Sequence, residues 1–192
     1  SYHLDKPERG FSFRHNGPLD MRMNLQSPLT AEHIINSYDE KKLKEIFSIY
    51  GELSNASRIA KTIVSARSND RIDSIESLIE IVSPLLPSQK INKMLAKLFQ
   101  SLRIEVNGEM DALKQMLLQV SKTLETDGRL VVISYHSLED RLVKNFLRTG
   151  NIQGDAEVDF YGNLISQFEQ LHRKVITPSE TEVEKNPRSR SA

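Results

Sequence analysis

Hydrophobic residues recur at helical spacing through the first half of the chain. Leu43, Ile46 and Phe47 begin a pattern at i, i+3, i+4 and i+7, with Asp39 as the predicted N-cap and Gly51 as the predicted stop. Three further stripes of this kind follow before residue 104. We therefore expect a small helical module in which every apolar stripe packs into a common core.

Capping and breaking residues mark the ends of these stripes. Asp73-x-x-Glu76 has the form of a capping box at the start of the third stripe, and Pro84 is the predicted end of that helix. The fourth stripe continues towards Leu124, with Asn107-Gly108 as the predicted kink or break.

The pattern changes after residue 128. Residues 129–135, RLVVISY, form a continuous apolar run rich in β-branched residues, which is typical of a strand buried on both faces of a parallel sheet. Ser137 is the predicted cap of a helix that follows this strand. A strand, a turn and a helix are half of a layered α/β architecture, so we predict an α/β fold that is mainly α in this chain.

The remaining segments are less regular. Residues 1–28 read as an extended loop pinned by apolar side chains, and 149–163 as a loop rich in Gly and Asp. Residues 172–177 favour a second short strand, and Ser179-x-x-Glu182 favours another capping box. The polar start at Ser1 and the ending NPRSRSA lead us to expect a fragment.

Composition excludes several classes of protein. Lys plus Arg and Asp plus Glu number 26 each, so no overwhelming basic field holds nucleic acid in the manner of a histone. The chain has no cysteine, which excludes disulfides, zinc fingers and thiolate catalysis. No apolar run approaches the ~18 residues of a membrane span, and no signal peptide is visible. We therefore predict a cytoplasmic protein without a membrane partner.

Common cofactor and metal motifs are also missing. The eight glycines never occur as G-x-G, so neither a dinucleotide fingerprint nor a phosphate-binding loop is present. His136 and Asp140 are spaced i, i+4 and would suit a shared metal, but no third ligand lies near them in sequence. We predict no metal site.

Candidate catalytic residues are concentrated in two short segments. In GPLDMRMN (17–24), Asp20 is a candidate acceptor, and the alternative is a buried loop in which Asp20 pairs with Arg22 or caps backbone amides. In YHSLEDR (135–141), His136 and Asp140 follow the predicted strand, where an open parallel sheet places its ligands. The alternative there is helix capping.

Five sequence blocks occur in a fixed order along the chain: DKPERGFSF with GPLDMRMN, ASRIAKTIVSAR, FQSLRIEVNGEMDAL, GRLVVISYHSLEDRLVKNF and NPRSRSA. In these blocks, from about Tyr2 to Ala192, the chain resembles the bacterial 16S ribosomal RNA (cytosine-N4)-methyltransferase family. The resemblance implies S-adenosylmethionine as cofactor, 16S ribosomal RNA in the small ribosomal subunit as partner, and methylation of a cytidine at N4.

The family resemblance also implies a fold and a division of the chain. The family has a Rossmann-like methyltransferase sheet interrupted by a helical insertion domain that is thought to grip RNA. Residues 1–28 would then be an active-site loop segment, 29–104 the helical insertion and 105–192 the C-terminal part of the methyltransferase domain. The family's first four strands and its glycine-rich cofactor loop are expected before Ser1, so we expect this chain alone to be inactive.

The resemblance and the placement of polar residues assign candidate roles. His3 matches a cofactor-contacting position of the family, whereas Asn24 stands where the family has Asp. Asp20, with His136 or Asp140, is our candidate for orienting the cytosine amino group, and we expect these residues to converge at the carboxyl end of 129–135. Candidate phosphate contacts are Arg9, Arg14, Arg22, Arg188 and Arg190, and candidate stacking residues are Phe11, Phe13 and Tyr135.

Two further expectations concern partners. A sheet that lacks strands exposes an edge, which makes a homodimer possible. The alternative function, from a different class, is a non-catalytic RNA-binding helical module.

Overall fold

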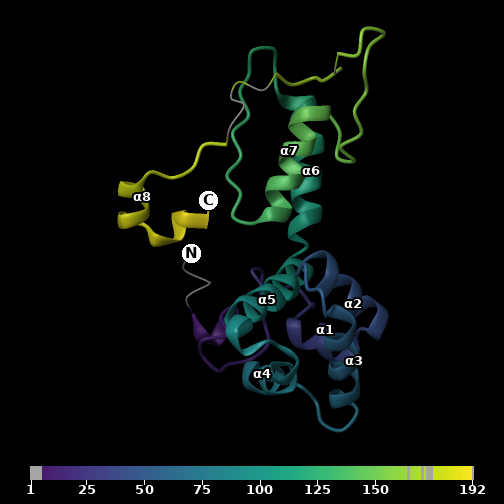
Figure 1. Ribbon diagram of the computed structural model, residues 1–192, viewed down its shortest axis with the longest axis vertical. Coiled ribbons are helices and arrows are strands. Elements are labelled where there is room, and N and C mark those ends of the chain that lie inside the picture. Colours follow the sequence, from purple (N-terminus) through teal and green to yellow (C-terminus); the bar gives the residue numbers. More distant parts are fainter. Residues whose placement is uncertain (1–5, 164, 170, 172–174, 192) are drawn as a thin grey trace. The chain divides into compact units, whose positions relative to one another are not determined.

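The computed structural model describes residues 6–163, 165–169, 171 and 175–191, and the chain divides into two compact units, Ser1–Glu109 and Met110–Ala192 (Figure 1). The part of the chain that is described contains eight α-helices and no sheet; an isolated antiparallel bridge joins Pro18 to Ser74. The chain is therefore mainly α, as predicted, but the predicted Rossmann-like sheet is absent from the described residues. None of the described helices is long and apolar enough to cross a membrane.

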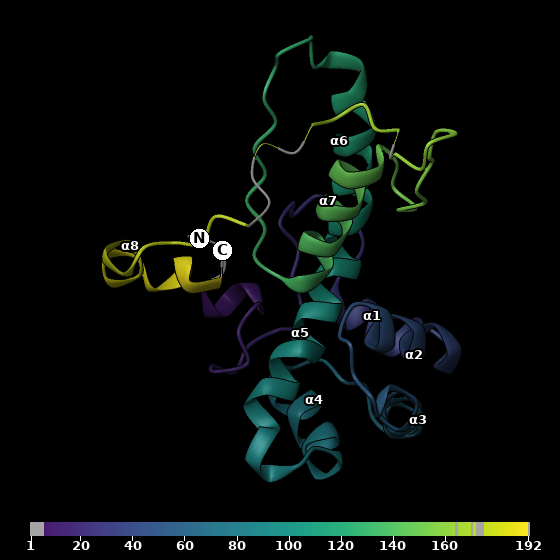
Figure 2. The same cartoon turned by 45° about the horizontal axis from the view of Figure 1, so that its top comes forward.

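The described residues of the first unit form five α-helices, whose arrangement is seen in Figures 1 and 2. Among them, α2 packs against α3 and α5, and α1 packs against the same two helices. Short 3₁₀ turns at Pro7–Arg9, Ser83–Leu85 and Ser88–Lys90 connect or precede them. The helices are α1 (Ala31–Ser37), α2 (Glu40–Ile49), α3 (Ala56–Arg67), α4 (Ile75–Val82) and α5 (Ile91–Asn107).

Among the predicted helix boundaries in this unit, those at Asp39 and Pro84 are confirmed and the one at Asp73 is wrong. Asp39 caps α2 by accepting a hydrogen bond from the Lys42 amide at 2.7 Å, and α4 ends before Pro84. The predicted capping box at Asp73-x-x-Glu76 is wrong by one residue, because Ser74 is the N-cap and exchanges hydrogen bonds with Ser77. The Asp73 carbonyl instead accepts from the Leu19 amide.

The core of the first unit joins the helices to the N-terminal loop. Leu19 and Met21 from this loop are as fully buried as the helical residues around them. The loop is therefore pinned by apolar side chains, as the sequence predicts. The fully buried helical residues include Ile34, Ile35, Leu43, Ile46, Phe47, Ile59, Ile63, Ile75, Leu78 and Leu102.

Gly108 separates α5 from the next helix. It adopts the left-handed conformation, with φ 58°, which glycine takes without steric cost, and the α5 helix ends at Asn107. The predicted break at Asn107-Gly108 is confirmed.

The second unit contains α6 (Glu109–Thr123), α7 (Ser137–Thr149), the short α8 (Glu180–Lys185) and a 3₁₀ turn at Pro187–Ser191. Its core is small: Leu117, Val143 and Phe146 are the buried members, and the ring of Phe168 lies 5.2 Å from that of Phe146. Ser179 caps α8 by accepting from the Glu182 amide, as predicted.

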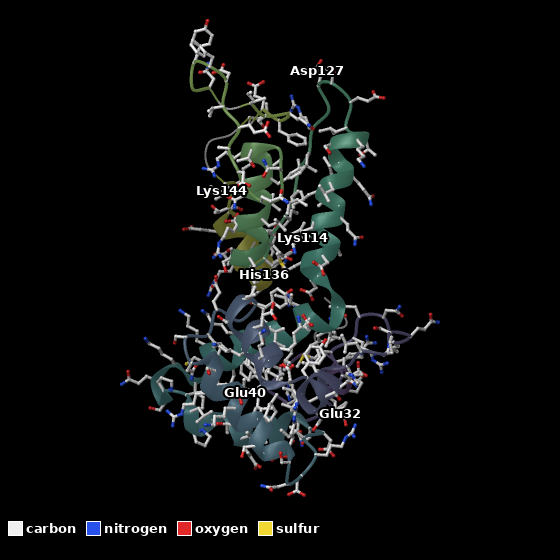
Figure 3. The ribbon with its side chains drawn as sticks, turned by 90° about the vertical axis from the view of Figure 1, so that its right-hand side faces the viewer. Glu32, Glu40, Lys114, Asp127, His136 and Lys144 are labelled. Atoms are coloured by element: carbon white, nitrogen blue, oxygen red, sulfur yellow. The ribbon has the colours of Figure 1, made fainter. Side chains whose placement is uncertain are left out.

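The predicted strand at 129–135 is wrong for the structure described here. The segment is extended and runs back along α6 and α7 from the turn at Asp127 (Figures 1 and 3), but it forms no ladder with any described residue. Val132 packs on the small core, whereas Val131 and Ile133 are 84% and 69% exposed. A strand exists only as part of a hydrogen-bonded ladder, and no described segment supplies the partner. Residues 175–177 are not a strand, and 172–174 lie outside the described residues.

Candidate functional site

Asp20 and Arg22 form a close ion pair in the loop before α1. Nε of Arg22 donates to Oδ1 of Asp20 at 2.9 Å, Nη2 donates to Oδ2 at 2.7 Å, and the Arg22 amide also donates to Oδ1. The hydrogen bond from Arg22 holds the pKa of Asp20 below its ordinary value, although partial burial acts in the opposite direction. Asp20 is therefore a carboxylate at neutral pH. Its pairing with Arg22, considered from the sequence as the alternative to a role as acceptor, is present.

The other side of Arg22 fixes the next turn of the loop. Its Nη1 donates to the carbonyls of Leu25 and Ser27 at 3.0 and 2.8 Å. Together with the two bonds to Asp20, these contacts use four of the five N–H donors of the guanidinium. Arg22 therefore holds the loop in shape, and its predicted phosphate contact stays a prediction.

Arg9 and Asn107 both bind the loop backbone at residues 21–23. Nη2 of Arg9 donates to the carbonyls of Arg22 and Met23, and the Arg9 carbonyl accepts from the Met21 amide. At the end of α5, Asn107 donates from Nδ2 to the Met21 carbonyl at 2.8 Å and accepts at Oδ1 from the Met23 amide at 2.7 Å. A polar cage thus surrounds the backbone of residues 21–23.

The backbone inside this cage is strained. Met21 is fully buried and has φ 60°, a conformation that a residue with a side chain rarely adopts. Such strain persists only where the surroundings over-determine the structure, and it is frequent at functional sites. Gly10 lets the backbone at residue 10 approach the backbone of Pro18 closely, since a Cβ at Gly10 would lie 2.2 Å from the Pro18 carbonyl oxygen. The loop is therefore built as a fixed structure around Asp20.

Residues 135–139, which follow the extended run, form a second cluster of polar side chains. His136 caps α7, with Nδ1 accepting from the Glu139 amide at 3.3 Å (Figure 3). Oε2 of Glu139 accepts a hydrogen bond from the Tyr135 amide at 2.8 Å, and Oε1 of Glu139 lies 3.4 Å from Nε2 of His136. The predicted cap at Ser137 is wrong, because the chain is still extended at His136 and Ser137 is already the first helical residue.

His136 and Asp140 differ in their surroundings. The His136 side chain is 9% exposed, whereas Asp140 is on the surface in the first turn of α7. Asp20 lies in the first unit and these two residues in the second, so the expected convergence of the three stays a prediction.

The remaining candidate residues fall at different places. Arg14 and Arg190 are exposed. His3 lies outside the described residues, and the side chain of Arg188 is not among those described. Their contacts with cofactor and RNA stay predictions.

Three contributors to these sites were not predicted. Arg9 was assigned to RNA, and Asn107 was interpreted only as a helix break, yet both hold the Asp20 loop. Glu139 was also missed, although a Glu in the first turn of a helix is a recognised signal of a helix start.

Comparison with known proteins places the chain in a class. All of residues 1–192 match the MraW methylase family, and the chain belongs to that family. It is 55% identical over 192 residues to the ribosomal RNA small subunit methyltransferase H of Bacteroides thetaiotaomicron, covering 100% of this chain and 63% of that protein. The enzymes of the same name from Amoebophilus asiaticus and Flavobacterium psychrophilum are each 50% identical over the whole chain, which spans 62% and 66% of their lengths.

Proposed function

We propose that this chain is part of an enzyme that transfers a methyl group from S-adenosylmethionine to N4 of a cytidine in 16S ribosomal RNA. The observation that carries the proposal is the match of all 192 residues to a methylase family, with relatives at 50–55% identity named for methylation of small-subunit ribosomal RNA. The N4 position, the small ribosomal subunit as partner and a cytoplasmic location are parts of this proposal.

The described residues do not by themselves fit S-adenosylmethionine. They include no strand that leads through a glycine-rich loop into a helix, which is the usual cradle for a nucleotide cofactor. The one residue assigned to the cofactor, His3, lies outside the described part. We therefore propose that this chain supplies the RNA-facing side of the reaction and is inactive alone.

Asp20 is suited to hold the amino group of the target base. A carboxylate offers about four lone-pair positions, and Arg22 fills three of them. One position on Oδ2 remains for a hydrogen bond from a cytosine amino group. Because Arg22 and the cage fix the carboxylate in advance, binding of the base would require no reorganisation of this group.

His136 and Asp140 would contribute from the start of α7. The imidazole is already oriented by two interactions with Glu139, and the Asp140 carboxylate is solvent-exposed. In the proposal, Asp140 accepts the second amino hydrogen or the proton released from N4 after transfer, and His136, whose two ring nitrogens both face Glu139, holds the start of α7 in place.

The test uses the full-length protein that contains this chain. It should be incubated with small ribosomal subunits from cells that lack the methylation and with S-adenosylmethionine, and the digested RNA examined by mass spectrometry. We expect one N4-methylated cytidine in 16S RNA, and none with the 192-residue chain alone. Methylation of a different atom would contradict the N4 assignment, and no methylation of any RNA would contradict the function.

The second candidate function is a non-catalytic RNA-binding helical module. It is favoured by the complete core of the first unit and by the lack of a cofactor cradle in the described residues. Calorimetric titration of the full-length protein with S-adenosylmethionine separates the two, since only the enzyme requires binding.

A further inference from the structure

A cavity of about 250 Å³ opens to solvent between the N-terminal loop and α5 in the first unit. Three aromatic rings line it: Phe11 and Phe13 from the loop, and Phe99 from α5. Phe99 is only 4% exposed and meets the ring of Phe13 edge-on, with 5.6 Å between the ring centroids. The apolar wall is therefore fixed by the core and does not depend on mobile surface side chains.

Two polar side chains of α5, Gln100 and Arg103, also line the cavity. Gln100 donates from Nε2 to the Tyr50 carbonyl at 3.2 Å, which orients the amide and leaves its oxygen as an acceptor. Arg103 is held by two hydrogen bonds of 2.9 Å to Glu109, through Nε and Nη2, so the donors on Nη1 remain. One acceptor and one donor, both held in place, thus flank the three rings.

Positive charge lies beside the cavity. Lys93 is on the same face of α5 as Ala96, Gln100 and Arg103, since these residues are spaced by three and four positions. Arg14 follows Phe13 directly and is exposed. Neither cation has a carboxylate partner within the described part of the chain.

We propose that this cavity binds one unpaired base of an RNA strand. The base would stack on the phenylalanine rings, its polar edge would meet Gln100 and Arg103, and adjoining phosphates would meet Arg14 and Lys93. Aromatic stacking with nearby cations is how proteins hold unstacked bases of single-stranded RNA. The volume lies below the range of about 300–1,000 Å³ typical of drug-sized ligands, which suits one planar heterocycle.

This inference rests on the proposed function only in taking RNA as the ligand. The cavity does not include Asp20, so the base it holds need not be the one that is methylated. It would anchor the strand at a second point and would be needed for affinity more than for the chemical step.

The test fills the cavity without removing any contact. Ala96 is an exposed helical residue that lines the cavity, so Ala96→Leu keeps helix propensity and occupies the space of the base. Ala112→Leu is the matched control, at an exposed alanine of α6. The probe is a fluorescein-labelled, cytidine-rich single-stranded RNA of about ten nucleotides, followed by fluorescence anisotropy with the 192-residue chain.

We expect Ala96→Leu to weaken binding of the single strand about tenfold or more, the scale of losing one stacked base. Binding of a duplex of the same sequence and the affinity of Ala112→Leu should not change. Phe13→Leu, which retains apolar volume but loses the ring, should also weaken single-strand binding, and thermal melting of each variant shows that it is folded.

Three results would overturn the inference: no binding of the single strand by the unmodified chain, equal binding of strand and duplex, or unchanged affinity in folded Ala96→Leu and Phe13→Leu. The last would leave the proposed methylation intact. Conversely, an expected loss of binding in a protein whose full-length form methylates no RNA would retain the cavity assignment and reject the proposed function.

Discussion

The two units of this chain respond differently to the same kind of sequence signal. In the first unit, amphipathic stripes close into a core of more than twenty buried apolar residues that also takes in Leu19 and Met21 of the loop. Among the described residues of the second unit, Leu117, Val143 and Phe146 alone are buried together, and the strongly apolar run 129–135 remains half exposed.

The contrast follows from where each element finds its hydrogen bonds. A helix satisfies its backbone within itself and needs only one apolar face to be covered. A buried strand needs neighbours on both edges and on both faces. From 129 to 134, no amide donates a hydrogen bond within the described part of the chain. A helical module can therefore be complete within 109 residues, whereas this apolar run has to be completed from outside the described residues.

Removal of one buried ring in each unit should show the difference in core strength. Phe47 and Phe146 are both almost completely buried. We expect Phe47→Ala to lower the free energy of unfolding by about 3–5 kcal/mol, as is typical for a closed core. Phe146→Ala should cost clearly less, because its partly exposed neighbours can move into the space. Urea denaturation followed by circular dichroism measures both, and equal losses would contradict the comparison.

The exposed run should make the chain self-associate, which is our interpretation of the possible homodimer. Val131 and Ile133 point away from the small core, and lysine at an open strand edge opposes pairing. We expect the double variant Val131→Lys, Ile133→Lys to weaken self-association about tenfold or more in sedimentation velocity. Ile49→Lys, at an exposed apolar residue of α2, is the control and should have no effect. Unchanged association in the double variant would exclude this surface.

Tyr38 gives the smallest expected effect and tests the first unit alone. Its hydroxyl donates to Glu105 at 3.0 Å, and burial, together with that carboxylate, raises the pKa of Tyr38 to about 12. Stability from this raised pKa is complete below the ordinary value of 10.0 and declines as the pH rises towards 12. Tyr38→Phe should cost about 1 kcal/mol near neutral pH and remove part of that alkaline decline. Tyr161→Phe, at an exposed tyrosine, should change neither, and an unaltered pH profile in Tyr38→Phe would contradict the assignment.

The sequence was sufficient for features that depend on neighbouring residues. Helix positions, the Asp39 cap and the break at Gly108 are set by local spacing and by glycine. The caps at Ser74 and His136 were each misplaced by one residue, because adjacent residues could serve equally well and only the backbone conformation decides between them. The strand at 129–135 failed because its identity depends on partners that a linear pattern does not specify.

In the candidate site, too, contacts between residues close in sequence could be predicted, whereas contacts between distant residues could not. The pairing of Asp20 with Arg22 spans two residues and could be considered from the sequence. The support from Asn107 comes from more than eighty residues away, and no spacing rule connects a helix end to a distant loop. The aromatic cavity is equally non-local, since Phe99 joins Phe11 and Phe13 only after folding.

The central claim is that the first unit presents Asp20 as a prearranged carboxylate with one position left for the substrate. Its most direct test is single-turnover methyl transfer by the full-length protein carrying Asp20→Asn, together with thermal melting. We predict that transfer slows by about 10²-fold or more, the scale of losing one positioned catalytic group, while affinity for S-adenosylmethionine hardly changes. If Asp20 only holds the loop, stability should instead fall by about 1–3 kcal/mol with activity following it. Full activity in a stable Asp20→Asn enzyme would contradict the claim.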